Sequence, residues 1–208
     1  MWDKKWLMQY PLINFSEGES IIKLGDVVSY YYYLVSGICA RTIPTSEGDE
    51  IIMEYFHEGD MLGLRLRQFG EESVSEFVAR KPCCCYKIPW QDVEKRIRED
   101  RNLCYALYQK STWEVDFWAT SWLVKALGGG ISILCLALCA QAKLQQDGSY
   151  KVDSMFTNME LSKYCGVHPV SISRFMTQLS REGILERKKS GIQILDMEKL
   201  VSYINQSE

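Results

Sequence analysis

The sequence predicts an α+β fold in three successive parts: an antiparallel β-roll of the jelly-roll type, one long helix, and a winged helix-turn-helix near the C-terminal end. Short β-prone runs recur along the first part of the chain at a spacing of roughly ten residues. An apolar pattern with a heptad period follows over residues 100–127. Two short amphipathic segments, separated by a glycine, then precede a basic hairpin.

The β-roll is predicted from alternating apolar runs and turns. Aromatic and β-branched residues fill the runs, whereas Gly and acidic residues fill turns such as Gly25-Asp26 and the polar segment 44–49. The candidate strands are 20–24, 30–35, 38–43, 51–56, 74–79 and 83–88. Strands this short and this regularly spaced favour an antiparallel barrel or jelly roll.

A long helix is expected over 100–127, after a short helix over 89–97 that Pro89 begins. Alternating steps of three and four residues give a mostly apolar stripe with two polar breaks. The stripe consists of Leu103, Ala106, Lys110, Trp113, Phe117, Thr120, Val124 and Leu127. Trp118 and Trp122 form a second apolar stripe. We therefore expect one surface to face the barrel and the other a second copy of the chain, in a homodimer.

Gly128, Gly129 and Gly130 interrupt this helix before the next one, expected over 131–145. Each glycine costs about 1 kcal/mol relative to alanine in a helix interior, so the helix should break here. The glycines either only terminate the helix or form a hinge, and three in a row exceed what a terminator requires. The predicted domains are a sensor β-roll at 1–98, a dimerisation helix at 99–127 and a winged helix-turn-helix domain at 128–208.

Residues 157–179 have the pattern of two short helices joined by a tight turn. Gly166 ends the first helix, His168 stands at the N-cap of the second, and Pro169 opens it. The apolar face of the second helix consists of Ile172, Phe175, Met176 and Leu179. The side chains expected to meet bases or phosphates are His168, Val170, Ser171, Ser173, Arg174 and Gln178.

The segment that follows predicts a wing. Residues 187–191 form a basic turn between a short strand at 184–185 and the alternating run 192–195. Lys188 and Lys189 stand at its tip, where we expect them to contact DNA. In a winged helix-turn-helix the second helix enters the major groove. The alternative is a helical hairpin packed in a core, which would need neither a basic tip nor a polar helix face.

Composition fits a regulator with a separate sensor domain. The 208 residues carry a net charge of −3, yet residues 157–208 hold seven Lys and Arg against six Asp and Glu. Eight cysteines without an apolar leader indicate a cytoplasmic chain with reduced thiols. The apolar run 121–142 contains Lys125 and the three glycines, so we expect two helices there and no contact with a membrane.

In this order, the parts resemble the Crp/Fnr family of transcription regulators, named after the cyclic-AMP receptor protein and the fumarate-nitrate reductase regulator. The resemblance extends over residues 15–195, and its markers are 33–37, 55–63 and 166–174. Within the family, the last of these phrases is most similar to regulators of halogenated-compound respiration. The resemblance implies a cyclic-nucleotide-binding-like sensor domain and a homodimer. It also implies an inverted repeat of double-stranded DNA, a small-molecule effector and RNA polymerase as partners.

Two departures from the family pattern bear on the effector. Members that bind cyclic nucleotides follow the glycine at the position of Gly63 with a Glu that binds the ribose, and here Leu64 follows it. An arginine that pairs with the cyclic phosphate is replaced by Ser73 in an ungapped alignment. Without these two polar anchors, the effector is expected to be a molecule other than cyclic AMP.

The effector is expected between the strands and the long helix. The candidate contributors are Tyr33, Leu64, Arg65, Trp113 and Phe117. Arg65 and Arg67 either bind a different anion or lie solvated, and we favour the second interpretation. A further departure concerns DNA: most members have a Glu, which accepts a hydrogen bond from a cytosine, where this chain has Val170.

No metal or cofactor is expected. The family's iron–sulfur sensors use cysteines near the N-terminus, whereas the first cysteine here is Cys39. The run 83–85 lies on a predicted strand, where neighbouring side chains point to opposite faces. Cys135 and Cys139 lack the second pair that a four-ligand site needs. We expect mostly buried, inert thiols, and the alternative is a redox-responsive regulator that uses one or two of them.

A metalloenzyme of the cupin type is the rival from another functional class. Such enzymes hold their metal with several histidines and a carboxylate, but this chain has two histidines, His57 and His168. Nothing in the sequence resembles a nucleophile with a base and an orienting acid. We therefore expect no enzymatic activity.

Overall fold

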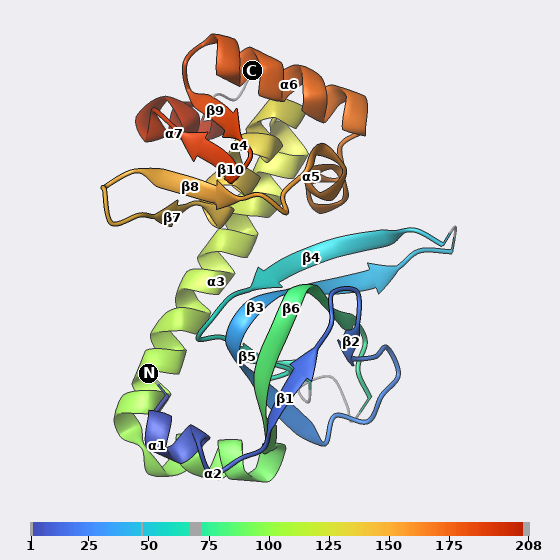
Figure 1. Ribbon diagram of the computed structural model, residues 1–208, viewed down its shortest axis with the longest axis vertical. Helices are drawn as coiled ribbons and strands as arrows, with labels where there is room; N and C mark the ends of the chain where they lie inside the picture. Colours follow the sequence, from blue (N-terminus) through green and yellow to red (C-terminus); the bar gives the residue numbers. More distant parts are fainter. Residues whose placement is uncertain (1, 47, 67–71, 206–208) are drawn as a thin grey trace. The chain divides into compact units, whose positions relative to one another are not determined.

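The computed structural model describes residues 2–46, 48–66 and 72–205. The fold is α+β, as predicted, and it divides into two compact units, Met1–Thr112 and Trp113–Glu208 (Figure 1). The boundary lies inside the long helix, so the second half of that helix belongs to the same unit as the helix-turn-helix. The division into domains at 1–98, 99–127 and 128–208 stays a prediction.

The first unit is built on one antiparallel sheet. Its strands are β1 (Leu12–Phe15), β2 (Ser20–Ile22), β3 (Tyr30–Pro44), β4 (Glu50–Phe56), β5 (Met61–Leu62) and β6 (Glu76–Pro89). They follow the order β1-β6-β3-β4, with β2 also paired to β6 and β5 to β3. β3 and β6 pair from Tyr30↔Pro89 to Thr42↔Glu76. The predicted runs 30–35 and 38–43 are therefore one strand.

Gly37 explains why a turn-like Ser-Gly pair lies inside this strand. Its φ is 103°, in the region that favours glycine, and the β3–β6 register shifts on both sides of it. A Cβ at Gly37 would lie 2.4 Å from the carbonyl oxygen of Pro82. The strand therefore bends at a bulge and continues.

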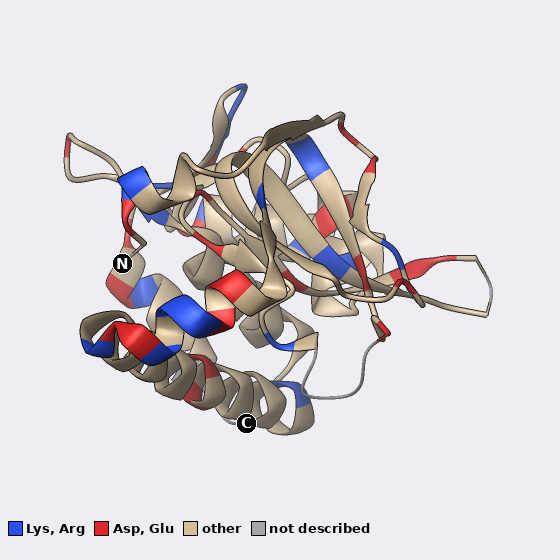
Figure 2. Ribbon diagram, turned by 90° about the horizontal axis from the view of Figure 1, so that it is seen from below, with Lys and Arg blue, Asp and Glu red and all other residues tan. Residues whose placement is uncertain are grey.

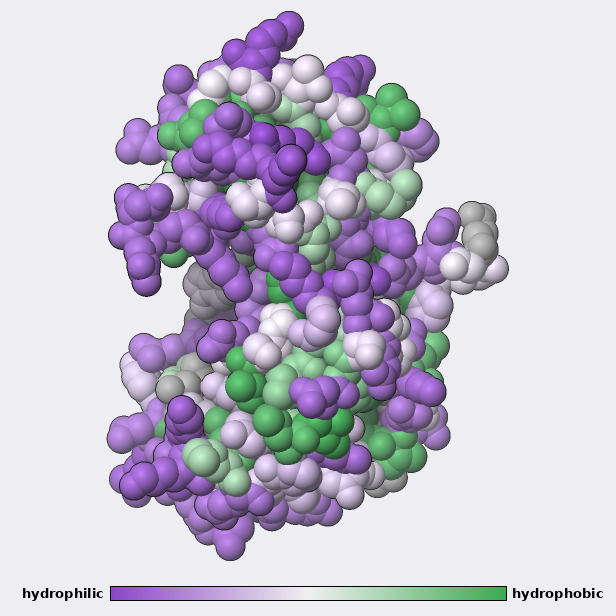
Figure 3. Space-filling view, viewed as in Figure 1, coloured by the Kyte–Doolittle hydropathy of each residue, from purple (hydrophilic) through white to green (hydrophobic). Residues whose placement is uncertain are grey.

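An apolar core fills this unit, and two short helices, α1 (Lys4–Leu7) and α2 (Trp90–Glu99), lie at its end (Figure 1). Trp2 stacks on Trp6 with ring centroids 5.6 Å apart, and Trp6 meets Tyr10 edge-on at 5.1 Å. The Tyr10 hydroxyl donates to Asp92 of α2 at 3.2 Å. Outside the core, Leu12 of β1 is 51% exposed. Figure 3 shows apolar surface over β1 and β6.

The long helix is α3 (Arg101–Leu127). Asp100 begins it, because one carboxylate oxygen accepts from the backbone N–H groups of Asn102 at 3.1 Å and Leu103 at 3.0 Å. Lys110, a polar break in the predicted stripe, forms an ion pair with Asp60 at 2.5 Å. Within the described residues, no helix is long and apolar enough to span a membrane.

The second unit contains the remaining elements. They are α4 (Gly130–Gln141), β7 (Lys143–Leu144), β8 (Tyr150–Asp153), α5 (Asn158–Cys165), α6 (Pro169–Arg181), β9 (Leu185–Lys188), β10 (Gly191–Ile194) and α7 (Met197–Asn205). The strands form an antiparallel sheet in the order β7-β8-β10-β9. α4 packs against α5, α6 and α7, and Leu134, Leu161 and Ile172 are fully buried. α4 ends before the predicted residue 145 because 143–144 pair with β8.

Candidate nucleic-acid interface

The turn between α5 and α6 is formed by local backbone chemistry. The Thr157 hydroxyl caps α5 by accepting from the N–H of Glu160 at 3.2 Å. Gly166 ends the helix with a φ of 68°. Nδ1 of His168 accepts from the N–H of Val170 at 3.3 Å, and Pro169 fills the first turn of α6. The predicted helix-turn-helix is confirmed.

α6 has one buried face and one exposed row. Ile172, Met176 and Leu179 are buried. The exposed row, whose members recur at steps of three and four, consists of Val170, Ser173, Arg174, Thr177, Ser180 and Arg181. Val170 is 70% exposed. Thr177, Ser180 and Arg181 were missed by sequence reasoning, although continuing the helical period from Arg174 would have found them.

Gln178 lies off this row. Its side-chain nitrogen donates to Glu182 at 3.1 Å and to the hydroxyl of Tyr203, on α7, at 3.3 Å. The Tyr203 hydroxyl in turn donates to Glu182 at 2.5 Å. These hydrogen bonds, that from Tyr203 first, lower the pKa of Glu182. The network ties the end of α6 to α7, so the Gln178 amide is already engaged.

The wing is the hairpin of β9 and β10. Lys188 pairs with Gly191 across the turn. A Cβ at Gly191, whose φ is 134°, would lie 2.2 Å from the carbonyl oxygen of Val152, so glycine is required there. Lys188 lies 3.1 Å from Glu186 and also contacts Gln193, whereas Lys189 is exposed in the turn. The hairpin projects as a loop whose ribbon is blue (Figure 2).

A groove of about 570 Å³ lies between the exposed row of α6 and the wing. Arg181 of α6 and Arg187 of β9 line it, together with Asn158, which begins α5. The Arg187 guanidinium donates to the Asn158 side-chain oxygen. Burial lowers the pKa of Arg187, but an arginine remains charged at neutral pH. The groove therefore offers two cations beside the exposed row, as phosphate binding requires.

The candidate effector residues lie in both units. Tyr33 is on β3, and Leu64 and Arg65 follow β5. Leu64 is half-buried and packs against the core of the first unit. Trp113 and Phe117 belong to the second unit, where their rings stack with centroids 5.6 Å apart.

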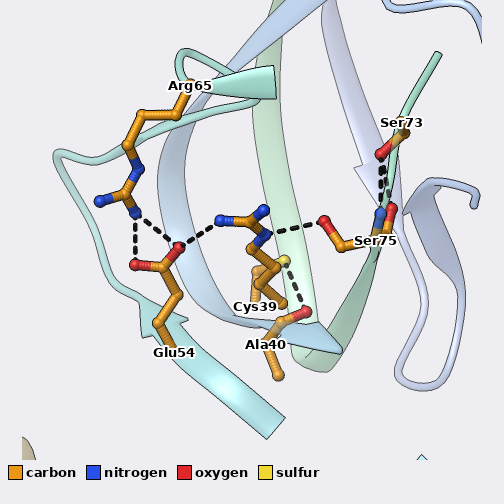
Figure 4. Close-up of polar contacts among 7 residues, drawn as sticks. Cys39, Ala40, Glu54, Arg65, Ser73 and Ser75 are labelled. Carbon is orange, nitrogen blue, oxygen red and sulfur yellow. Dashed lines mark hydrogen bonds and ion pairs between the residues drawn. The ribbon is translucent and has the colours of Figure 1, made fainter. Parts of the chain in front are cut away.

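Arg65 is paired rather than solvated. Its guanidinium lies 2.5 Å from both carboxylate oxygens of Glu54, on β4 (Figure 4). Arg41, opposite Glu54 on β3, reaches the same carboxylate at 3.3 Å and donates to the Ser75 hydroxyl at 2.7 Å. The side chains of Arg41 and Glu54 are only 12% and 15% exposed. Ser73 is buried, and its hydroxyl donates to the Ser75 carbonyl at 2.5 Å.

Sequence reasoning missed the cluster of Arg41, Glu54 and Arg65. Arg41 and Glu54 are opposite charges on strands that are otherwise apolar. That they face each other becomes apparent only once the register of β3 and β4 is known. Arg67, which was considered alongside Arg65, lies outside the described residues.

Burial is the main influence on the acidity of the cysteine thiols. It raises the pKa of six of the eight cysteines: Cys39, Cys83, Cys85, Cys135, Cys139 and Cys165. The pKa of Cys83 and of Cys139 rises to about 11, and that of Cys165 to about 12. Because the thiolate is the reactive form, these groups are poor nucleophiles at neutral pH. Cys104, on α3, is exposed. In the described parts of the chain, no cluster of His, Cys, Asp and Glu could hold a metal.

We expect Cys104 to react with a disulfide reagent such as dithionitrobenzoate at pH 7.5 far faster than the buried thiols, which should react only on unfolding. The measurement is the release of the chromophore before and after adding denaturant. Cys104→Ser should remove the fast phase. If the fast phase persists in that variant, either the half-buried Cys84 or a buried thiol is reactive, and the redox-responsive alternative would gain support.

Two family models match this chain, one over the β-sheet region and one over the helix-turn-helix region. Residues 12–100 match the family model described as cyclic nucleotide-binding domain, and residues 133–203 match the Crp-like helix-turn-helix domain. The cAMP-activated global transcriptional regulator CRP of Salmonella typhimurium is 23% identical, over 87% of this chain and 88% of that protein. The transcriptional activator protein FnrL of Cereibacter sphaeroides is 19% identical, over 83% and 71%.

Solved structures agree in fold. FixK2 from Bradyrhizobium japonicum has a TM-score of 0.77 at 18% identity, covering 93% of this chain and 96% of that one. CprK complexed with OCPA has a TM-score of 0.68 at 20% identity, covering 94% and 92%. A sensor domain of the cyclic nucleotide-binding type thus precedes a Crp-type helix-turn-helix, and curated relatives match over most of their length. The chain belongs to the Crp/Fnr family of transcription regulators.

Proposed function

We propose that this protein is a homodimeric regulator that reads an inverted repeat in double-stranded DNA through α6 and responds to a small-molecule effector other than cyclic AMP. The observation that carries the proposal is the exposed row of α6 beside a groove lined by Arg181 and Arg187. We propose that the protein acts in the cytoplasm, where it meets its DNA, and that RNA polymerase is a further partner at promoters.

Within this proposal, the exposed row faces base edges and the flanking cations face phosphates. Arg174, Ser171 and Ser173 provide polar groups to the major groove, and Val170 provides methyl groups. Arg181, Arg187, Lys188 and Lys189 neutralise phosphates beside the helix. His168 caps α6 and Gln178 fastens its far end, so both hold the helix that makes these contacts.

The base preference at Val170 tests the role of α6. With no hydrogen-bond acceptor, its side chain favours the thymine methyl group over a G·C pair. Sites selected from a random duplex library should therefore carry an A·T pair opposite Val170. Changing that pair to G·C should cost about 1–3 kcal/mol in binding free energy per half-site.

Val170→Glu is the matched variant. Glutamate accepts a hydrogen bond from the cytosine amino group, so this variant should prefer G·C at the same pair. Recovery of a strict G·C pair by the unsubstituted protein, with no change of preference in Val170→Glu, would show that another side chain contacts this pair.

The homodimer is proposed on a surface of α3. The set of residues recurring at steps of three and four, all exposed in the single chain, is Tyr105, Tyr108, Thr112, Val115, Ala119, Trp122 and Ala126. We call it the α3 seam. Tyr108, Val115 and Trp122 are 65%, 66% and 69% exposed. A second copy of the same helix would cover this row in a coiled coil with a heptad repeat.

The α3 seam is offset by two residues from the apolar stripe that begins at Leu103. In that stripe, Leu103 and Val124 are buried within the chain, and Lys110 is paired with Asp60. These three residues are therefore used inside the single chain. Trp113 and Leu127 of the same stripe are 64% and 67% exposed, but of the two rows only the seam is exposed at every one of its positions, which is why we propose it for the partner.

Cyclic AMP is not expected to bind. Leu64 offers no group to the ribose, and Arg65 is held by both oxygens of Glu54. A cyclic phosphate approaching Arg41 or Arg65 would have to displace this carboxylate and would be repelled by it. Isothermal calorimetry should show no binding heat at millimolar nucleotide.

Micromolar binding of cyclic AMP would contradict that expectation. Arg65→Ala would then show whether Arg65 had exchanged Glu54 for the phosphate, because the variant would lose the binding.

A further inference from the structure

The joint between α3 and α4 is made of three glycines, and a Cβ on the first of them, Gly128, would lie 2.7 Å from the carbonyl oxygen of Val124. None of Gly128, Gly129 and Gly130 has a positive φ, and Gly129, the N-cap of α4, has φ −77° and ψ 167°. Any residue adopts such values without strain. Another property of the joint must therefore distinguish these positions.

The three glycine positions differ in the space that a side chain would have there. A Cβ on Gly129 would meet nothing within 4 Å. A Cβ on Gly130 would lie 2.9 Å from Cε2 and 3.3 Å from Cζ of Phe175, which is closer than such atoms normally approach. The Phe175 ring of α6 therefore lies directly on the first turn of α4, in the room that a missing side chain leaves.

The same ring contacts Arg174. The guanidinium carbon of Arg174 lies 5.3 Å from the centroid of the Phe175 ring. A guanidinium at this distance is attracted by the negative face of an aromatic ring. One half-buried side chain thus connects the glycine joint with the exposed arginine of α6.

We propose that Phe175 is a positioning residue for Arg174, which it holds in the exposed row of α6 while Gly130 seats its ring against α4. A displacement at the joint between α3 and α4 then moves the ring, and with it the guanidinium. Packed contacts transmit such displacements because close-packed interiors do not deform freely. This proposal rests on the proposed role of α6 in DNA recognition.

A freely flexible hinge is the competing explanation of the glycines. In that case, alanine at Gly129 and alanine at Gly130 would stiffen the joint alike, since an alanine backbone has less conformational freedom than a glycine backbone. The contact with Phe175 predicts different outcomes, because only the second substitution collides with the ring.

The experiment compares Gly130→Ala with Gly129→Ala in the full chain. The readout is the ratio of affinities for a selected operator and for an unrelated duplex. Gly129→Ala should match the unsubstituted protein. Gly130→Ala should lower the ratio by about 5- to 30-fold across two half-sites, the effect of losing an exposed cation–π contact in each. Affinity for the unrelated duplex should stay unchanged, because phosphate contacts dominate it. Equal ratios for the two variants would overturn the proposal.

Phe175→Leu provides a second test if Gly130→Ala folds poorly. Leucine keeps an apolar contact but has no ring face, so the operator ratio should fall while the melting temperature changes little. In the double variant Gly130→Ala with Phe175→Leu, the smaller side chain should restore the melting temperature, and the ratio should stay low. An unchanged ratio in Phe175→Leu would overturn the positioning role.

Arg174→Ala on the same duplexes separates this proposal from the proposed function. If Arg174→Ala loses the operator preference while Phe175→Leu keeps it, the positioning role is wrong and DNA recognition by α6 stands. If neither variant loses the preference, recognition by α6 is wrong, and the positioning role with it.

Discussion

Replacing Arg174 by alanine is expected to abolish specific DNA binding and to leave the fold intact. Arg174 is exposed in the middle of α6, so its removal opens no cavity. A good arginine–base contact is worth about 1–3 kcal/mol, and a two-fold operator contains two of them. Gel-shift titration should therefore show a loss of about 2–6 kcal/mol in binding free energy.

Lys189→Ala is the matched control for Arg174→Ala. Lys189 is exposed in the turn of the wing, where a phosphate contact is proposed. Its loss should weaken binding to all sequences alike and reduce the dependence of log affinity on log salt by about two, one for each half-site. Unchanged operator affinity in Arg174→Ala, with an unchanged melting temperature, would contradict the assignment of α6 as the recognition helix.

Val115→Glu is expected to convert the homodimer to monomers. Val115 lies near the middle of the α3 seam and is 66% exposed in the single chain, so the monomer should tolerate the charge. Two glutamates facing each other in a coiled coil would be desolvated next to a like charge. Sedimentation analysis should show a monomer, and operator affinity should fall because each half-site then binds independently.

Thr120→Glu distinguishes the two possible faces of α3. Thr120 belongs to the apolar stripe that begins at Leu103, but it lies outside the α3 seam and is exposed. We expect the protein with Thr120→Glu to remain dimeric. Dissociation by Thr120→Glu combined with a stable Val115→Glu dimer would show that the stripe beginning at Leu103 is the interface.

The helix-turn-helix could be predicted from the sequence because its signals act on nearby backbone. Gly166 supplies a left-handed φ, His168 accepts one N–H, and Pro169 opens a helix, each within three residues of its own position. Gln178 shows the limit of this reasoning. Its partner Tyr203 lies 25 residues away on α7, and no helical period reveals such a contact.

Which face of α3 is used within the chain depends on contacts with residues that are distant in the sequence. The helix carries two apolar stripes, and composition alone does not determine which one the chain uses internally. Lys110 is engaged by Asp60, 50 residues away in the sequence. The cluster of Arg41, Glu54 and Arg65 likewise depends on the register of β3 and β4. For this reason the β-roll could be predicted, and the polar cluster within it could not.

The central claim is that two copies of α6 read two half-sites of one inverted repeat. The most direct test titrates the full-length chain with duplexes that carry both half-sites at varied centre-to-centre spacing. We predict two chains per duplex and the highest affinity at about 10–10.5 base pairs, where both recognition helices face the same side of the DNA. Affinity that is independent of spacing, or a single half-site that binds as tightly as the pair, would contradict the account.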